Sequence, residues 1–140
     1  MANKKKKSTQ VTGNVGMYYV SYCLSRMGFN VIPTSRNAKG IDLVVYNEDN
    51  SRMIGIQVKC LSGKTAVPLG YHDNLDHLMD VPWTIVVQNK DAEPSVYLVT
   101  SDEVKAGANQ EKGGSWWLGY KKFAGPDTLN RWNLITDHLV

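Results

Sequence analysis

The chain has 140 residues, of which 42% are hydrophobic, and its formal net charge is +3. This length and composition exclude a disordered polymer and predict a single domain over residues 11–140. No apolar run approaches the roughly 18 residues that cross a bilayer, so we expect no membrane segment. Cys23 and Cys60 lack the spacing of a zinc site or a disulfide framework. We therefore expect a cytoplasmic protein with reduced thiols packed in its core.

The N-terminal third opens with a basic segment and continues as a helix. Residues 1–10 include the lysine run 4–7 and are expected to form a flexible tail, which can add affinity for phosphates. Apolar residues recur at three- and four-residue spacing over residues 15–27, which predicts a helix capped by Thr12 or Asn14. Gly28 stands where a left-handed cap belongs.

The rest of the chain alternates short apolar segments with turn residues. The expected strands are residues 29–34, 41–46, 52–61, 83–88 and 96–100, with a short strand at 116–118. Helical turns are expected at 74–79, a helix capped by Ser101 or Asp102 follows, and a closing helix is expected at 127–139. Strands 41–46 and 52–61 form a hairpin around a polar turn. This order predicts an α/β fold with a mixed central sheet flanked by helices.

Polar side chains interrupt the two hairpin strands. Asp42 lies at the start of an apolar strand, where a carboxylate is costly unless it is paired or binds a metal. Gln57 and Lys59 share one face of the second strand, because strand side chains alternate. If the strands pair, these three residues converge, and their groups suit an oxygen-ligated Mg²⁺ beside a phosphate. The simpler alternative is that Asp42 caps the strand entry and Lys59 is its salt-bridge partner.

The segment Gly40-Ile41-Asp42, followed by Ile56-Gln57-Val58-Lys59, resembles the core of the PD-(D/E)XK nuclease superfamily. The upstream residues 12–31, with Gly13 and Gly16, resemble the first helix and strand of Holliday-junction-resolvase-like and restriction-type members. The resemblance implies a restriction-endonuclease-like core of helix, three strands, helix and strand. It also implies a metal-dependent endonuclease that hydrolyses phosphodiester bonds of duplex or branched DNA.

The resemblance assigns roles to four residues. Asp42 is implied as the central ligand of Mg²⁺ or Mn²⁺, Gln57 as a second ligand in place of the usual Glu, and the Val58 carbonyl as a third. Lys59 is implied to orient and help deprotonate the attacking water and to stabilise the developing charge. Two departures, Met17 where the family often has Glu and the neutral Gln57, leave a second hypothesis. The chain is then a catalytically inactive nuclease-fold module that binds nucleic acid or a protein partner.

Other polar and aromatic residues give weaker signals. Phosphate contacts are expected from a loop before the site and one after it, at Arg36, Asn37, Lys39 and Lys64. The cluster His72, Asp73, Asp76 and His77 has poor spacing for one metal and is interpreted as a surface turn. Trp83 and Trp132 are expected to pack in the core, and one of the pair at 116–117 is expected to be exposed at a dimer contact. We expect a homodimer, since one site cuts one strand.

Overall fold

The computed structural model describes residues 9–35, 40–76 and 84–140, which contain four helices and eight strands. The helices are α1 (Thr9–Arg26), α2 (Ser101–Gly107), α3 (Tyr120–Phe123) and α4 (Asn133–Leu139). The strands are β1 (Asn30–Pro33), β2 (Leu43–Tyr46), β3 (Met53–Leu61), β4 (Val67–Tyr71), β5 (Thr84–Gln88), β6 (Ser95–Val99), β7 (Ala108–Gln110) and β8 (Ser115–Leu118).

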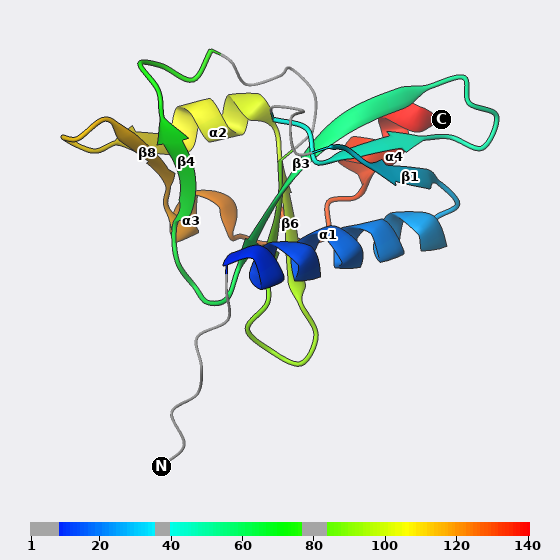
Figure 1. Ribbon diagram of the computed structural model, residues 1–140, viewed down its shortest axis with the longest axis horizontal. Coiled ribbons are helices and arrows are strands. Elements are labelled where there is room, and N and C mark those ends of the chain that lie inside the picture. Colours follow the sequence, from blue (N-terminus) through cyan, green and yellow to red (C-terminus); the bar gives the residue numbers. More distant parts are fainter. Residues whose placement is uncertain (1–8, 36–39, 77–83) are drawn as a thin grey trace.

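The strands form two sheets. The larger sheet has the order β1-β2-β3-β5-β6, and the smaller has the order β4-β8-β7. In the larger sheet β3 and β5 run parallel, while the other neighbours are antiparallel. Figure 1 shows the smaller sheet at one end of the molecule and α4 at the other. The predicted α/β class, with a mixed sheet and helices, is therefore confirmed.

Strand β3 changes its neighbour halfway along its length. Its first half pairs with β2 up to the residue pair Leu43 and Ile56. Its second half pairs with β5 from Gln57 onward, on the opposite edge. Gln57 is therefore the point at which one neighbour ends and the other begins, and the β2 edge of β3 runs on past the end of β2.

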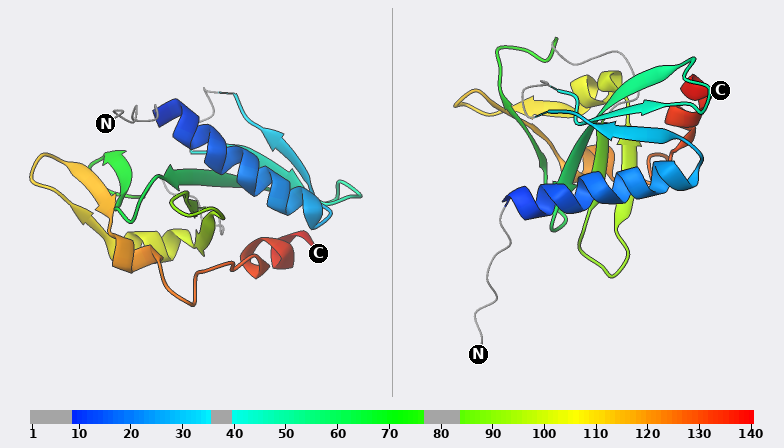
Figure 2. Two further views of the ribbon diagram at one scale, coloured as in Figure 1. Left: turned by 90° about the horizontal axis from the view of Figure 1, so that it is seen from below. Right: turned by 45° about the vertical axis from the view of Figure 1, so that its right-hand side comes forward.

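Two apolar clusters lie on opposite faces of β3. The first joins Ile56 and Val58 to the buried Val20 and Leu24 of α1, and it also contains the buried residues of α4. Figure 2 shows α1 running beside the strands β1 to β3. The second cluster contains Leu61 together with buried residues of β4, β5, β6, α2, β8 and α3. Each face of β3 is thus covered by a different part of the chain.

Helix α1 approaches β3 most closely at Gly16. A Cβ atom on Gly16 would stand 2.6 Å from the Cβ of Cys60 and 3.3 Å from a methyl group of Val58. The first contact involves an atom fixed to the strand backbone, which a side-chain rotation cannot move. A residue larger than glycine would therefore push the helix away from β3. Both cysteines are unpaired and partly buried, and Cys60 packs against the first cluster, as predicted.

We expect Gly16→Ala to lower the free energy of unfolding by about 1–3 kcal/mol, because it overpacks this contact. Gly13→Ala is the matched control, since a Cβ there meets nothing within 4 Å. In the same helix it should stabilise by up to about 1 kcal/mol through helix propensity alone. Urea denaturation of the two variants measures the difference. Equal stability of the two would contradict a tight contact at Gly16.

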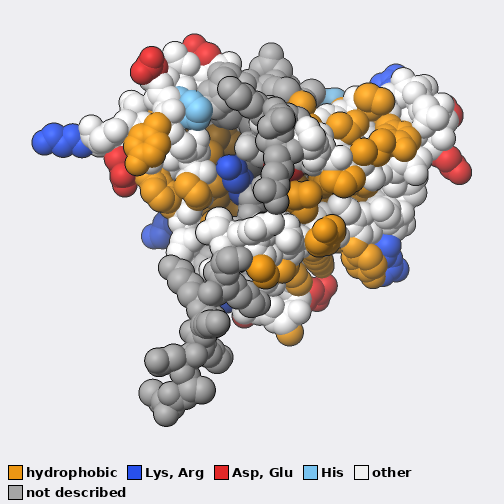
Figure 3. Space-filling view, in the orientation of Figure 1, with side chains coloured by type: hydrophobic (Ala, Val, Ile, Leu, Met, Phe, Trp, Pro, Cys, Tyr) orange, Lys and Arg blue, Asp and Glu red, His pale blue; other side chains and the backbone are white. Residues whose placement is uncertain are grey.

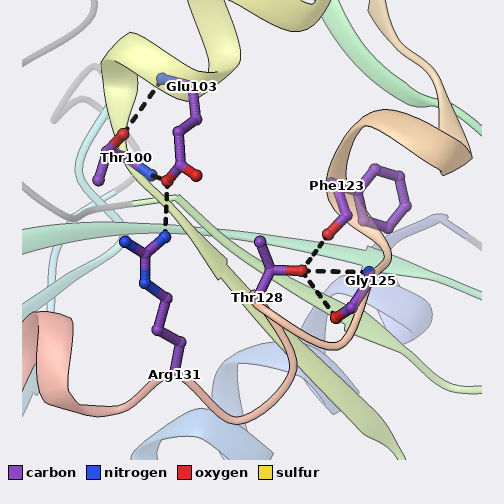
Figure 4. A network of polar contacts seen from close by, with 6 residues as sticks. All are labelled: Thr100, Glu103, Phe123, Gly125, Thr128 and Arg131. Atoms are coloured by element: carbon purple, nitrogen blue, oxygen red, sulfur yellow. Dashed lines mark hydrogen bonds and ion pairs between the residues drawn. The ribbon is translucent and has the colours of Figure 1, made fainter.

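Polar contacts hold the segments of the C-terminal forty residues together around α2 and α3 (Figure 4). Thr100 caps α2 through a capping box with Glu103, and Glu103 also forms an ion pair of 2.8 Å with Arg131. The hydroxyl of Thr128 donates to the Phe123 carbonyl at the end of α3. The segment between α3 and α4 is thus bonded to α2 through Arg131 and to the end of α3 through Thr128. It is followed by α4, whose buried residues belong to the first cluster.

Several boundaries differ from the sequence predictions. Helix α1 begins at Thr9, so Thr12 and Asn14 lie inside it and are not caps. Thr100 rather than Ser101 or Asp102 caps α2. The closing helix begins only at Asn133. Strands β4 and β7 and helix α3 were not predicted, and residues 74–76 of the expected helical turns are not helical. Gly28 has φ of 95°, which confirms the left-handed cap.

Candidate functional site

Asp42 lies immediately before β2 and is held by its backbone and its side chain. Its N–H donates to the Ile56 carbonyl at 2.8 Å, and its carbonyl accepts from the Thr34 N–H at 2.9 Å. Its carboxylate Oδ2 accepts a hydrogen bond of 2.8 Å from the Val58 N–H. The last residue pair of β2 and β3 joins Leu43 to Ile56. The carboxylate therefore bonds β3 just beyond its last pairing with β2, and β2 begins at Leu43, two residues later than predicted.

Val58 presents its peptide group to the edge where Asp42 lies. In an extended strand the N–H and C=O of one residue point to the same side. Because the Val58 N–H meets Asp42, the Val58 carbonyl also faces the Asp42 side of β3. No described residue donates a hydrogen bond to the second carboxylate oxygen, Oδ1. A carboxylate oxygen and a backbone carbonyl, both suited to hard cations, thus stand at one edge.

Gln57 and Lys59 flank Val58 and project to one face of β3. Residues alternate along a strand, so both share the face of Leu61, which belongs to the second cluster. Lys59 is also the register partner of Val86, another member of that cluster. The prediction that Gln57 and Lys59 share one face of β3, with Val58 on the other face, is confirmed. Gln57 is the first residue of β3 beyond its pairing with β2, the strand that Asp42 immediately precedes.

The Lys59 ammonium group is in an unfavourable environment for its charge. Burial lowers the pKa of Lys59, and the negative charge of Asp42 opposes this only in part. In the described part of the chain the only ion pair is that of Arg131 with Glu103. Lys59 is therefore not the salt-bridge partner of Asp42, so this half of the simpler alternative is wrong, whereas the Asp42 carboxylate does bond β3 at the entry of β2. A partly buried lysine with a lowered pKa is the form that can take up or release a proton nearer neutral pH.

Few other groups could support a metal at this site. Among residues 9–35, 40–76 and 84–140, no three His, Cys, Asp or Glu side chains come together as a metal-binding group. Met17, where the resemblance would place a Glu, packs against the first cluster. Any cation here would depend on one carboxylate, with amide and carbonyl oxygens beside it, which is a weak ligand set.

Of the four residues expected to contact phosphates, only Lys64 is described. Arg36, Asn37 and Lys39 lie outside the described residues. Lys64 is exposed in the turn between β3 and β4, and it makes no ion pair with a described residue. The structure thus brings together Asp42, Gln57, Val58 and Lys59, as the sequence predicts, and gives no contact of Lys64 with them.

The tryptophans resolve as packing where they are described, and His72, Asp73 and Asp76 lie in an exposed turn, as predicted. Trp132 packs against the first cluster, as predicted. Trp116 packs against the second cluster and donates from its indole N–H to the His72 carbonyl at 2.6 Å. The indole N–H of Trp117 is buried and has no hydrogen-bond partner among described residues. Trp83 and His77 lie outside the described residues.

Thr34 is a residue of this site that the sequence analysis missed. Its hydroxyl donates to the Ile41 carbonyl and, at 3.3 Å, to the Asp42 carbonyl, in addition to the N–H bond already described. The register of β1 and β2, in which Pro33 opposes Leu43, extends to place Thr34 opposite Asp42. Pairing the two predicted strands from their sequences would have found it. Thr34 fixes the backbone from which the Asp42 carboxylate reaches β3.

We expect Thr34→Val to weaken this arrangement, because it removes the hydroxyl and keeps the shape of the side chain. The cost should be about 1 kcal/mol of unfolding free energy, with faster hydrogen exchange of the Val58 amide. Thr34→Ser keeps the hydroxyl and is the control. Unchanged exchange of the Val58 amide in Thr34→Val would show that the hydroxyl does not position Asp42.

Comparisons with models of protein families, with curated proteins and with solved structures find no match. None of the helices in the described ranges combines the length and the apolar character needed to span a membrane.

Proposed function

We propose that the chain is a metal-dependent endonuclease with a PD-(D/E)XK core, which hydrolyses DNA phosphodiester bonds. The hydrogen bond from the Val58 N–H to the Asp42 carboxylate carries the proposal. This bond places the Asp42 carboxylate beside the peptide group of Val58. Gln57 and Lys59, the two polar residues of this part of β3, flank Val58 in sequence. The resemblance of Gly40-Ile41-Asp42 and Gln57-Val58-Lys59 to the superfamily supports it. The free cysteines suit a reducing compartment, so we place the protein in the cytoplasm.

The residues present fit a hard divalent cation, Mg²⁺ or Mn²⁺. Asp42 would hold it through Oδ1, which accepts no hydrogen bond from a described residue, with the Val58 carbonyl and the Gln57 amide oxygen beside it. When bound, such a cation lowers the pKa of water and polarises a phosphate. In its uncharged form, Lys59 would orient the attacking water and help to remove its proton. The lowered pKa of Lys59 favours this form. Its charged form would instead stabilise the phosphorane.

Cleavage of DNA tests this proposal directly. We expect the protein to nick supercoiled plasmid or to cut a branched oligonucleotide with Mg²⁺ or Mn²⁺, and to cut neither in EDTA. Cleavage of both strands of a duplex calls for two sites, so we also propose a homodimer, which light scattering measures. A clean, folded protein that cuts neither substrate with either metal would exclude the enzyme.

The second candidate is an inactive module with the same fold that binds nucleic acid or a protein partner. The packing of Met17 in the core and the single carboxylate of the site favour it. Titration with Mn²⁺ separates the two candidates, because only the enzyme needs a metal bound beside Asp42. Binding of Mn²⁺ that is lost in Asp42→Asn supports the enzyme.

Gln57→Glu should strengthen the site, since it restores a second negative charge without changing the length of the side chain. We expect the Mg²⁺ concentration for half-maximal cleavage to fall by about tenfold, because affinity rises with the charge of the ligands. The Mg²⁺ dependence of plasmid nicking measures this. An unchanged or higher requirement for Mg²⁺ would mean that residue 57 does not contact the cation.

A further inference from the structure

The outward side of α1 carries two exposed tyrosines. Tyr18 and Tyr22 are 69% and 58% exposed, and their spacing of four residues places them on one side of the helix. The opposite side, with Gly16, Val20 and Leu24, is buried against the sheet. Figure 3 shows hydrophobic side chains along the part of the surface where Figure 1 draws α1. The rings are large apolar groups that no described part of the chain covers.

Arg26 extends this row by one more helical turn. Its guanidinium carbon lies 5.7 Å from the centroid of the Tyr22 ring, and its Nη1 donates to the Tyr22 hydroxyl at 3.1 Å. A cation over a ring face is attracted to it and restricts the ring. Tyr18, Tyr22 and Arg26 therefore form a partly ordered row of aromatic and cationic groups, which we call the tyrosine face.

The charge of α1 is entirely positive. Arg26 is the only charged residue between Thr9 and Arg26, and the lysine run at residues 4–7 precedes the helix in sequence. The negative charge of Glu93 lies near a different side of the helix, where it helps to raise the pKa of Tyr19 and of Cys23. A negatively charged partner would complement this positive charge, whereas a second copy of the same face would offer it no opposite charge.

We propose that the tyrosine face binds single-stranded nucleic acid, with bases stacked on Tyr18 and Tyr22 and phosphates paired with Arg26. Surfaces of this kind bind single strands by combining positive charge with aromatic rings, and they tolerate many sequences. The face lies on the side of β3 opposite to Lys59, because α1 packs on the Val58 side of that strand. It is therefore a second site, and it does not depend on the proposed nuclease activity.

Fluorescence anisotropy of a labelled oligo(dT) of about 20 nucleotides tests this, in EDTA so that no cleavage occurs. We expect the double variant Tyr18→Ala, Tyr22→Ala to bind at least about tenfold more weakly than the unaltered protein. Tyr71→Ala is the matched control, since Tyr71 is 76% exposed on β4, and it should bind normally. Arg26→Gln should reduce the slope of log affinity against log salt by about 0.7.

Thermal melting of the double variant checks its fold, and the single variants Tyr18→Ser and Tyr22→Ser replace it if it is unstable. Equal affinity of the folded variants and the unaltered protein, or no binding by the unaltered protein at low salt, would overturn the proposal. So would a dimer, by light scattering, that becomes a monomer in the double variant, because the face would then be a contact between copies. These results leave the test of cleavage untouched.

Discussion

Lys59→Met is expected to abolish metal-dependent cleavage while making the protein more stable at neutral pH. Burial lowers the pKa of Lys59 more than Asp42 raises it, so the charged form of Lys59 is held at a net cost. Methionine fills a similar volume without a charge. We expect a gain of about 1 kcal/mol and a rise in melting temperature of about 3 °C. The loss of cleavage follows from removal of the group that orients the water.

The stability gain has a definite pH dependence. The pKa of Lys59 is lower in the folded state than its unfolded value of about 10.4, so the unfolded chain binds more protons between the two values. The cost of burying Lys59 is therefore fully present below the folded pKa and disappears as pH rises to about 10.4. The stability difference between Lys59→Met and the unaltered protein should shrink over that window.

Urea denaturation of both proteins at neutral and at alkaline pH measures this difference. The pH-dependent contributions of titrating groups that both proteins share cancel in it. Lys112→Met is the matched control, because Lys112 is exposed in the turn between β7 and β8 and its replacement should change neither stability nor cleavage much. Destabilisation by Lys59→Met at neutral pH would show that the charge of Lys59 has a structural partner. Normal cleavage by this variant would remove Lys59 from the mechanism.

Asp42→Asn is expected to abolish cleavage and metal binding with little loss of stability. The asparagine side chain still offers an oxygen to the Val58 N–H, but it carries no charge for a cation. Asp42→Ala removes the oxygen as well and leaves the Val58 N–H without this partner. It should therefore cost a further 1–3 kcal/mol, roughly, of unfolding free energy.

Parallel measurements of unfolding and cleavage distinguish the two variants of Asp42. If Asp42→Asn still cuts with Mg²⁺, the carboxylate is a structural group that closes the end of β2. If the two variants unfold at the same denaturant concentration, the hydrogen bond to Val58 contributes nothing to stability.

The sequence predicts the parts of the fold that depend on local pattern. The hairpin of β2 and β3 follows from alternation on both sides of a turn, and it is enough to place Gln57 and Lys59 on one face. The convergence of Asp42 with Val58 follows from the same pairing. The cap at Gly28 follows from a glycine at the end of an apolar helical pattern.

The remaining features depend on contacts between distant segments. Strand β4 contains Pro68 and Gly70, which disfavour a strand locally. It nevertheless pairs with the distant strand β8, in which Leu118 opposes Val67. The register of this pair is irregular between Pro68 and Gly70. The close contact at Gly16 is set by the position of Cys60 and cannot be read from either segment alone. The pKa of Lys59 depends on what covers its face of β3, which includes residues from the C-terminal half.

The most direct test of the proposed site compares plasmid nicking by the unaltered protein, Asp42→Asn and Lys59→Met across a range of Mn²⁺ concentrations. We expect nicking by the unaltered protein that rises with Mn²⁺ and disappears in EDTA, and none by either folded variant. Nicking that persists in EDTA, or that both variants retain, would contradict a metal-dependent nuclease built on Asp42 and Lys59.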